Sequence, residues 1–199
     1  PLTIGITGTN GKTTVTQLTT AILKQCFSVS TTLGNYNNDI GLPLSILRSS
    51  GKNFQRCVYE LGASKKNDIS YLVNICEPKM TALLNVSEAH MESFGSFETL
   101  INTKEEIFSH LNTDQVVLNR DDERFTRWKK INKHKKITTI SMFNDADYFI
   151  EKTDDEFFYI STPTGKFELI KKNSSEILTI NLLFSIALAM EAGADIQSV

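Results

Sequence analysis

The sequence has few of the features that mark zinc-binding, secreted or membrane proteins. Only three of its 199 residues are cysteines, Cys26, Cys57 and Cys76, and no two form a Cys-x-x-Cys pair. This spacing argues against a zinc site and predicts buried thiols in a reducing cytosol. No run of 18 apolar residues is present, so the sequence predicts no membrane-spanning helix. A net charge of −2 gives no general attraction to nucleic acid or to an anionic membrane.

What the sequence does contain fits one globular domain. The hydrophobic content of 40% is enough for a packed core, and the length is that of a single domain. Residues Lys129–Lys136 form a basic cluster, which we interpret as a solvated helix end rather than a nucleic-acid site. We therefore expect a domain that binds neither nucleic acid nor membrane.

The segment from Gly5 to Thr14, Gly-Ile-Thr-Gly-Thr-Asn-Gly-Lys-Thr-Thr, predicts a phosphate-binding loop. It joins an apolar stretch to an amphipathic run, which is the strand, glycine loop and helix order of a P-loop. Lys12 would neutralise the β- and γ-phosphates, and the Thr13 hydroxyl would bind Mg²⁺. The usual first glycine is replaced by Ile6, so the alternative is a glycine-rich turn without a ligand. The loop residues expected to bind ATP are Gly8, Thr9, Asn10, Gly11, Lys12, Thr13 and Thr14.

Apolar stretches alternate with helical ones through the first 140 residues. The candidate strands are Leu2–Ile6, Phe27–Ser30, Arg56–Glu60, Met80–Asn85, Gln115–Leu118 and Ile137–Ser141. The candidate helices are Lys12–Lys24, Leu42–Arg48, Asn67–Cys76, Ser96–Phe108 and Glu123–Asn132. This alternation predicts an α/β P-loop fold, with a mostly parallel sheet and helices on both faces. A small antiparallel β meander (Tyr148–Lys152, Glu156–Ser161 and Lys166–Lys171) and a helix Ile180–Ala192, ending before Gly193, are expected to follow.

Polar residues fall at the carboxyl ends of several predicted strands, where such sheets bind their ligands. The P-loop follows the first strand, Glu60 ends another, and the segment from Asn85 to His90 follows a third. A carboxylate that ends an apolar strand opposite a P-loop is well placed to hold Mg²⁺, directly or through water. The alternative for Glu60 is a helix-capping or surface carboxylate. His110 and His134 lie in no motif, and we assign them no role.

Three dispersed motifs occupy the first half of the chain. They are Gly8-Thr-Asn-Gly-Lys-Thr-Thr14, Asn35-Tyr-Asn-Asn-Asp-Ile-Gly-Leu-Pro43, and Asn85-Val-Ser-Glu-Ala-His-Met-Glu-Ser-Phe-Gly-Ser96 followed by Glu98 and Lys104-x-Glu106-Ile107. Together they resemble the Mur ligase family, whose members use ATP to join an amino acid or peptide to a carboxylate. The resemblance implies that residues 1–199 are the central ATP-binding domain of a three-domain enzyme. The N-terminal UDP-binding domain and the C-terminal Rossmann-like domain would be absent, and the isolated domain would be inactive.

The resemblance also implies the cofactors, ATP and Mg²⁺, and the roles of individual side chains. Lys12, Glu60, His90 and Lys104 would be the catalytic residues. Lys104 would react with CO₂ to form a carbamate, whose two oxygens suit Mg²⁺ better than an ammonium does. The alternative is an ordinary lysine that pairs with Glu105, Glu106 or phosphate. The implied metal ligands are Thr13, Glu60, His90 and the carbamylated Lys104.

The remaining implied roles concern the substrate and the nucleotide. Asn35, Asn37 and Asn38 would face a muramoyl-peptide substrate, although asparagine-rich loops often only make turns. Asn119 and Asp122 would lie near the nucleotide, and Asn181 would contact its base. Members of the family usually carry His-Asn-x-x-Asn before the last helix, but the first two positions are Ile177 and Leu178 here. This departure puts recognition of the base in doubt.

The motifs best fit the family member that adds D-alanyl-D-alanine to UDP-N-acetylmuramoyl-tripeptide through an acyl phosphate. The expected setting is assembly of the peptidoglycan precursor in the bacterial cytoplasm, by a protein that acts as a monomer. Other ligases of the family remain alternatives, namely folylpolyglutamate synthase and the Mur enzyme that acts one step earlier. A non-catalytic nucleotide-binding module is the alternative from another class, and its only support is Ile177 and Leu178.

Overall fold

The computed structural model describes residues 1–88, 91–171, 175–195 and 197. Within these residues nine strands form one sheet, in the order β2-β3-β1-β4-β5-β6-β7-β8-β9. Strands β1 to β7 pair in parallel, and β7, β8 and β9 pair antiparallel. The strands are β1 (Leu2–Thr7), β2 (Val29–Thr31), β3 (Arg56–Glu60), β4 (Met80–Leu83), β5 (Gln115–Asn119), β6 (Lys136–Ser141), β7 (Tyr148–Thr153), β8 (Phe157–Thr162) and β9 (Gly165–Ile170).

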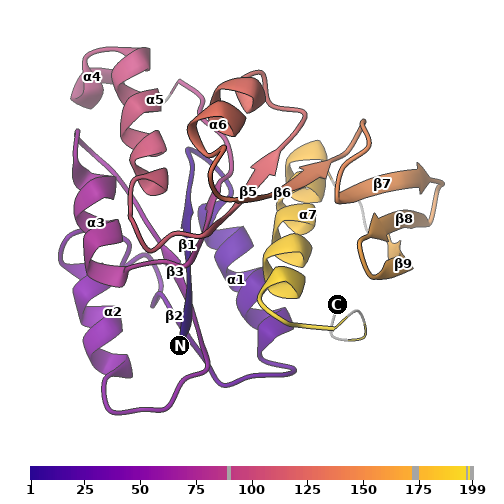
Figure 1. The fold of residues 1–199 in the computed structure, drawn as a ribbon, viewed down its shortest axis with the longest axis horizontal. Helices are drawn as coiled ribbons and strands as arrows, with labels where there is room; N and C mark the ends of the chain where they lie inside the picture. Colours follow the sequence, from indigo (N-terminus) through magenta and orange to yellow (C-terminus); the bar gives the residue numbers. More distant parts are fainter. Residues whose placement is uncertain (89–90, 172–174, 196, 198–199) are drawn as a thin grey trace.

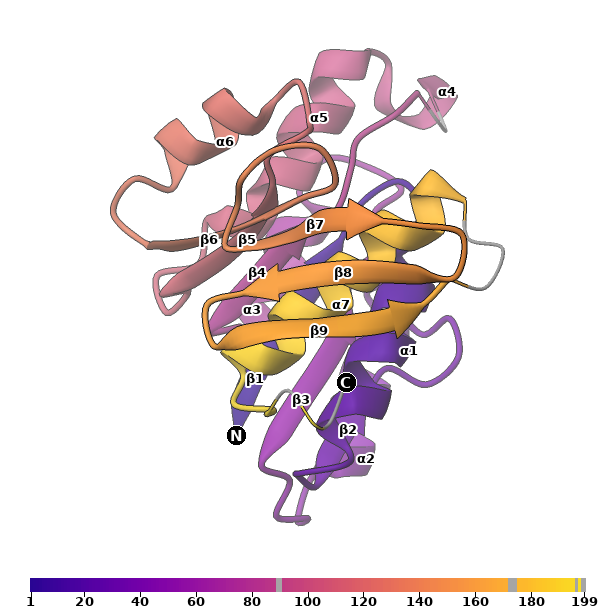
Figure 2. The ribbon, with the colours of Figure 1, turned by 90° about the vertical axis from the view of Figure 1, so that its right-hand side faces the viewer.

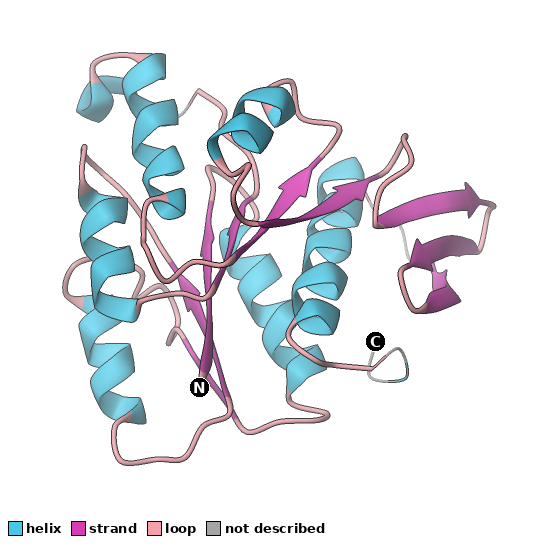
Figure 3. Ribbon diagram, in the orientation of Figure 1, coloured by secondary structure: helices cyan, strands magenta, loops and turns pink. Residues whose placement is uncertain are grey.

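Helices cover both faces of the parallel part of the sheet (Figures 1 and 3). They are α1 (Lys12–Leu23), α2 (Gly41–Ser49), α3 (Asp68–Cys76), α4 (Met91–Phe94), α5 (Phe97–Glu105), α6 (Phe125–Ile131) and α7 (Glu176–Glu191), and a 3₁₀ turn, Glu106–Phe108, extends α5. Helices α1 and α7 pack on one face, around residues such as Ile4, Ile6 and Phe184. Helices α2, α3, α5 and α6 pack on the other, around residues such as Tyr59 and Trp128. The predicted α/β fold is confirmed.

The meander β7–β9 is a continuation of the main sheet, because β7 pairs in parallel with β6. Figure 2 shows these three strands lying across helix α7. Phe158 and Ile160 of β8 are buried in the same core as α1 and α7. The meander therefore covers α7 on the side away from the parallel strands.

Several details differ from the sequence-based expectations. Helix α7 begins at Glu176 rather than Ile180, because Ser175 caps it by accepting a hydrogen bond from the backbone N–H of Leu178. The short helix α4 was not expected. Cys57 and Cys76 are buried as expected, but Cys26 is exposed, so the expectation of buried thiols is wrong there. In the described part of the chain, no helix is long and apolar enough to cross a bilayer.

Candidate functional site

The P-loop connects β1 to α1 at the carboxyl edge of the sheet. Gly11 adopts φ +84°, a conformation that glycine reaches without strain. A Cβ atom at Gly11 would also lie 2.4 Å from Oδ1 of Asn181, in helix α7. Asn181 is 3% exposed, and its Oδ1 has no hydrogen-bond partner among the residues that the structure describes. Helix α7 is therefore packed tightly against the turn that starts helix α1.

Residues after β4 hold the other side of the P-loop. The backbone N–H of Asn10 donates to Oδ1 of Asn85 at 2.9 Å, and Nδ2 of Asn85 donates to the carbonyl of Asn10 at 3.0 Å. The backbone N–H of Thr9 donates to the Asn85 carbonyl, and that of Ser87 donates to Thr9 Oγ1. The sequence placed the segment from Asn85 to His90 at this edge of the sheet, but it gave no signal for the individual roles of Asn85 and Ser87.

A buried carboxylate lies next to the loop. Glu60, the last residue of β3, is 2% exposed. Its Oε2 accepts a hydrogen bond from Thr13 Oγ1 at 2.8 Å, and its Oε1 accepts one from Asn37 Nδ2 at 2.6 Å. Its backbone N–H donates to Thr32 Oγ1. Carboxylate and hydroxyl oxygens so close together are ligands that suit Mg²⁺.

Two lysines lie at the same place, one of them half-buried and the other buried. Lys12 is half-buried, and its Nζ donates to the carbonyl of Thr9 at 2.9 Å. Burial lowers the pKa of Lys12, an effect that the charge of Glu60 partly opposes. Lys104, on α5, is 4% exposed, and burial together with the charge of Lys12 lowers its pKa to about 8. Two poorly solvated ammonium groups favour an anionic ligand.

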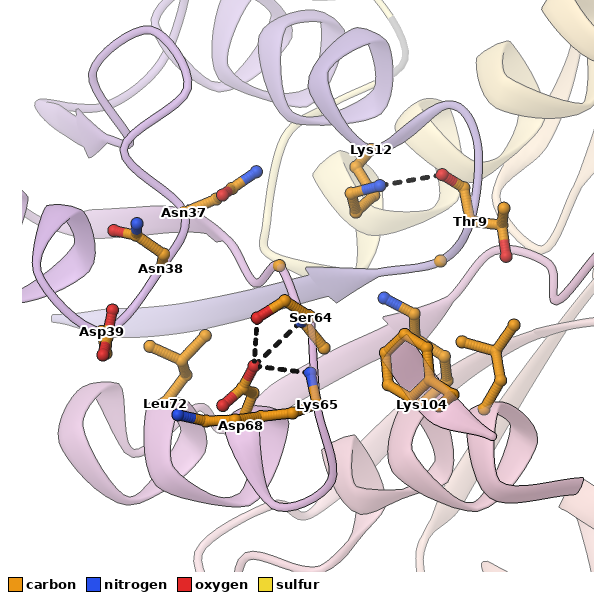
Figure 4. A pocket seen from close by; sticks show the side chains of 15 residues that line it. Thr9, Lys12, Asn37, Asn38, Asp39, Ser64, Lys65, Asp68, Leu72 and Lys104 are labelled. Carbon is orange, nitrogen blue, oxygen red and sulfur yellow. Dashed lines mark hydrogen bonds between the residues drawn. The ribbon is translucent and has the colours of Figure 1, made fainter. Parts of the chain in front are cut away.

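These groups line one cavity of about 320 Å³. Figure 4 shows Lys12 and Lys104 on one side of it and Asn38 and Asp39 on the other. Asp68, at the start of α3, also lines the cavity and holds the loop before α3 in place. Its Oδ2 accepts hydrogen bonds from the backbone N–H groups of Ser64 and Lys65, at 2.8 and 3.0 Å. The role of Asp68 was not predicted, because a single aspartate at a helix start gives no functional signal.

The structure brings most of the expected residues together, but not all. Gly8, Thr9, Lys12, Asn37, Asn38 and Lys104 line the cavity. Asn38 also accepts a hydrogen bond from the backbone N–H of Gly41 at 2.8 Å, which starts helix α2. Thr14 is half-buried in the first turn of α1. Asn35 is exposed and does not line the cavity. His90 lies outside the described residues.

Asn119 and Asp122 lie apart from this cavity, at the carboxyl end of β5. Asn119 Oδ1 accepts a hydrogen bond from the backbone N–H of Asp121. Asp122 accepts one from the backbone N–H of Arg124 at 2.8 Å, and its pKa is raised by burial. Both side chains shape the turn after the strand. Contact with a nucleotide, like the contact of Asn181 with a base, stays a prediction.

Comparison with known proteins gives this geometry a context. The family model "Mur ligase middle domain" matches residues 6–189. The UDP-N-acetylmuramoyl-tripeptide–D-alanyl-D-alanine ligases of Haemophilus influenzae and Escherichia coli are 34% and 31% identical to this chain, over 100% and 98% of it. The chain spans 45% and 44% of their lengths, so it corresponds to less than half of each relative.

Solved structures agree with the sequence relatives. A crystal structure of MurF from Acinetobacter baumannii superposes with a TM-score of 0.90 and 26% identity, over 99% of this chain and 44% of that one. MurF ligase from Thermotoga maritima, crystallised in complex with ADP, gives a TM-score of 0.85 and 28% identity, over 99% of this chain and 47% of that one. The FolC protein of Escherichia coli, at 13% identity and a TM-score of 0.71, shares the fold alone. The chain belongs to the Mur ligase family and carries the middle domain of its members.

Proposed function

We propose that the chain is the nucleotide-binding middle domain of a ligase that joins D-alanyl-D-alanine to UDP-N-acetylmuramoyl-tripeptide. The observation that carries this proposal is the convergence of Lys12, Thr13, Glu60 and Lys104, from helix α1, strand β3 and helix α5, on one P-loop edge. Relatives named for that activity match the whole chain, and they support the choice of substrates. The tripeptide, the dipeptide and the remaining domains are assigned to the whole enzyme, of which this chain would be the middle domain.

The residues fit a nucleoside triphosphate with its metal ion. The loop Gly8–Gly11 is braced from both sides, by Asn85 and by Asn181, which fixes the turn that leads into the N-terminus of α1, where backbone N–H groups can bind phosphate oxygens. Lys12 is placed to approach the β- and γ-phosphates. Thr13 and Glu60 would hold Mg²⁺ between their oxygens, and His90 is proposed for a second Mg²⁺. Thr14, in the first turn of α1, completes the loop.

Lys104 has the environment for carbamate formation. A neutral amine is the form that attacks CO₂, and a pKa of about 8 makes that form accessible near neutral pH. The carbamate would carry a negative charge, which neighbouring Lys12 and a bound Mg²⁺ would stabilise. We propose that Lys104 acts as a metal ligand in this form. A ¹³C NMR spectrum in labelled bicarbonate should show a carbamate resonance that is absent from Lys104→Arg.

The other end of the cavity is proposed for the substrate carboxylate. Asn37 and Asn38 face it from the loop before α2, and Asn35 would contact a more distant part of the muramoyl peptide. ATP would supply the phosphoryl group that makes the carboxylate reactive as an acyl phosphate. The task of this chain is to place that carboxylate in line with the γ-phosphate and to offset the negative charge with Lys12.

Calorimetry with this chain tests the proposal most directly. MgATP should bind, binding should weaken without Mg²⁺, and Glu60→Gln should remove most of the Mg²⁺ dependence. Absence of nucleotide binding would contradict the proposal. Phosphate release with ATP, both substrates and this chain alone should be negligible, because the N- and C-terminal domains of the family would be needed to hold the substrates and exclude water. The whole enzyme should show turnover that depends on both substrates. We propose that it acts in the cytoplasm and as a monomer. Nucleotide binding without such turnover would favour a non-catalytic module.

A further inference from the structure

Both oxygens of the Glu60 carboxylate accept hydrogen bonds from uncharged side chains. Thr13 Oγ1, in the first turn of α1, donates to Oε2 at 2.8 Å, and Nδ2 of Asn37 donates to Oε1 at 2.6 Å. Among the described residues, no lysine or arginine forms an ion pair with Glu60, although its side chain is buried. A buried carboxylate without a paired cation depends on such hydrogen bonds for its orientation.

Asn37 lies in the loop before α2, and the segment that follows Glu60 holds it in place. In the stretch 33–40 it is half-buried, while its neighbours are exposed. The backbone N–H of Gly62, two residues after Glu60, donates to the Asn37 carbonyl at 2.7 Å. A Cβ atom at Gly62 would lie 2.7 Å from Asn37 Oδ1, so the glycine leaves the space that the Asn37 side chain fills. The fold therefore holds this amide beside the carboxylate.

The next residue, Asn38, has different contacts. Its Oδ1 accepts hydrogen bonds from the backbone N–H groups of Ile40 and Gly41, at 3.3 and 2.8 Å, where helix α2 starts. Its own carbonyl accepts one from the backbone N–H of Leu42 at 3.0 Å. Both asparagines line the cavity, but Asn38 stabilises the start of a helix, whereas Asn37 contacts Glu60.

The contact with Glu60 matters for a metal ion at this place. An amide N–H group donates hydrogen bonds and does not bind cations, so Nδ2 of Asn37 would not be a ligand itself. Side chains that hydrogen-bond a metal-binding carboxylate fix its orientation and thereby raise the affinity for the metal. With Oε1 held by Asn37, the oxygens that lie together for Mg²⁺ are Oε2 of Glu60 and Oγ1 of Thr13.

We propose that Asn37 is a positioning residue, which holds Glu60 in the orientation that binds the Mg²⁺ of the nucleotide. The inference rests on the proposed function, because Glu60 must be a metal ligand. It makes a distinction that the substrate role of the loop does not. A residue that only contacts the muramoyl peptide has no effect on nucleotide binding when that peptide is absent, whereas Asn37 should have one.

Titration calorimetry with this chain, without any muramoyl peptide, tests the inference. The probes are MgATP and ATP in EDTA. Asn37→Leu, which removes the donor at similar size, should weaken MgATP binding by roughly 10- to 100-fold and leave metal-free ATP unchanged. The matched control is Asn53→Leu, at an exposed asparagine in the loop before β3, which should change neither affinity.

A double-mutant cycle with Glu60→Gln tests whether Asn37 acts through that carboxylate. In the Glu60→Gln background, Asn37→Leu should cause no further loss of MgATP affinity, because the group that it orients is gone. Asn37→Ala is the second variant, in case leucine disturbs the fold, and it should show the same dependence on Mg²⁺. Circular dichroism and a thermal melt check that each variant is folded.

The outcomes separate the inference from the function on which it rests. If both Asn37 variants bind MgATP like the parent chain, the positioning role is wrong while the P-loop assignment stands. If they weaken MgATP and metal-free ATP equally, or if their effect persists in Glu60→Gln, Asn37 supports the site only structurally and the inference again fails. If the parent chain binds neither probe, the proposed function and the inference both fail.

Discussion

The two sites where α5 carries charge are built in opposite ways. At the cavity, Lys104 is buried and Lys12 is half-buried, no ion pair with either is found among the described residues, and both pKa values are lowered. Between α5 and α6, Arg127 pairs with Glu98 and Glu105 at 2.8 Å, and both contacts raise its pKa. Matched charges join two helices, whereas unmatched buried charges cost stability unless a ligand pairs with them.

The difference has a direct consequence for mutation. Removing a cation from the matched site should cost stability, because its partners lose hydrogen bonds. Removing one from the cavity should cost ligand affinity while the fold keeps its stability or gains some. The two regions can therefore be told apart by measuring binding and unfolding on the same variants.

The largest effect is expected for Lys12→Ala. Loss of a charge-assisted contact to a triphosphate should weaken MgATP binding by on the order of 2–4 kcal/mol, with unfolding unchanged or shifted upward. Calorimetry and a urea melt measure the two quantities. Lys24→Ala, at an exposed lysine that follows the same helix, is the matched control and should bind ATP normally. Parent-like affinity in Lys12→Ala would mean that the cavity is not a phosphate site.

Lys104 should produce a pH dependence of stability. Its pKa is about 8 in the folded chain and 10.5 ordinarily, so below pH 8 both states are protonated and the buried charge destabilises the fold. Between pH 8 and 10.5 the unfolded chain binds more protons, and the free energy of unfolding should rise with pH, by at most about 3 kcal/mol. Lys104→Met should be more stable than the parent at pH 7 and should show a smaller rise.

Urea melts from pH 6 to 10.5 measure this dependence. Lys24→Met is again the matched control, and it should follow the parent curve because its side chain is exposed. If Lys104→Met were less stable than the parent at pH 7, Lys104 would be a structural residue. The contrast between the two sites on α5 would then be lost.

Removing Glu105 should lower stability, in contrast to removing Lys104. Its side chain is 9% exposed, and it accepts hydrogen bonds from Trp128 Nε1 at 2.9 Å and from Arg127 at 2.8 Å. Glu105→Ala leaves the buried indole N–H unpaired, so it should lower the free energy of unfolding by about 1–3 kcal/mol. MgATP affinity should change far less than in Lys12→Ala. A loss of affinity without loss of stability would place Glu105 in the site instead.

The sequence predicted the parts of the site whose signal is local. Lys12 and Thr13 belong to one continuous motif, and Glu60 ends an apolar strand. Asn85 was not predicted to hold Asn10, because the two residues are 75 positions apart and meet only through the pairing of β1 with β4. The partnership of Glu105 with Arg127 likewise depends on how α6 packs beside α5.

The start of α7 shows a different limit. The predicted helix started at Ile180 and left out Ile177 and Leu178, which are apolar but exposed. The helix nevertheless begins at Glu176, since Ser175 provides a cap and helix formation does not require burial of every turn. Ile177 and Leu178, which depart from the His-Asn-x-x-Asn pattern of the family, are exposed on this first turn.

The smallest effect is expected for Glu98→Ala, which sharpens the comparison within the matched site. Glu98 is 60% exposed, and Arg127 retains its ion pair with Glu105 when Glu98 is removed. The free energy of unfolding should therefore fall by only about 0.5 kcal/mol, from a surface ion pair and a favourable charge in the first turn of α5. In about 1 M salt the loss should nearly vanish, because exposed charges are then screened within about 3 Å. The loss in Glu105→Ala should persist in that salt, since its main cause is an unpaired buried N–H group. Equal salt sensitivity of the two variants would show that both act through surface charge alone.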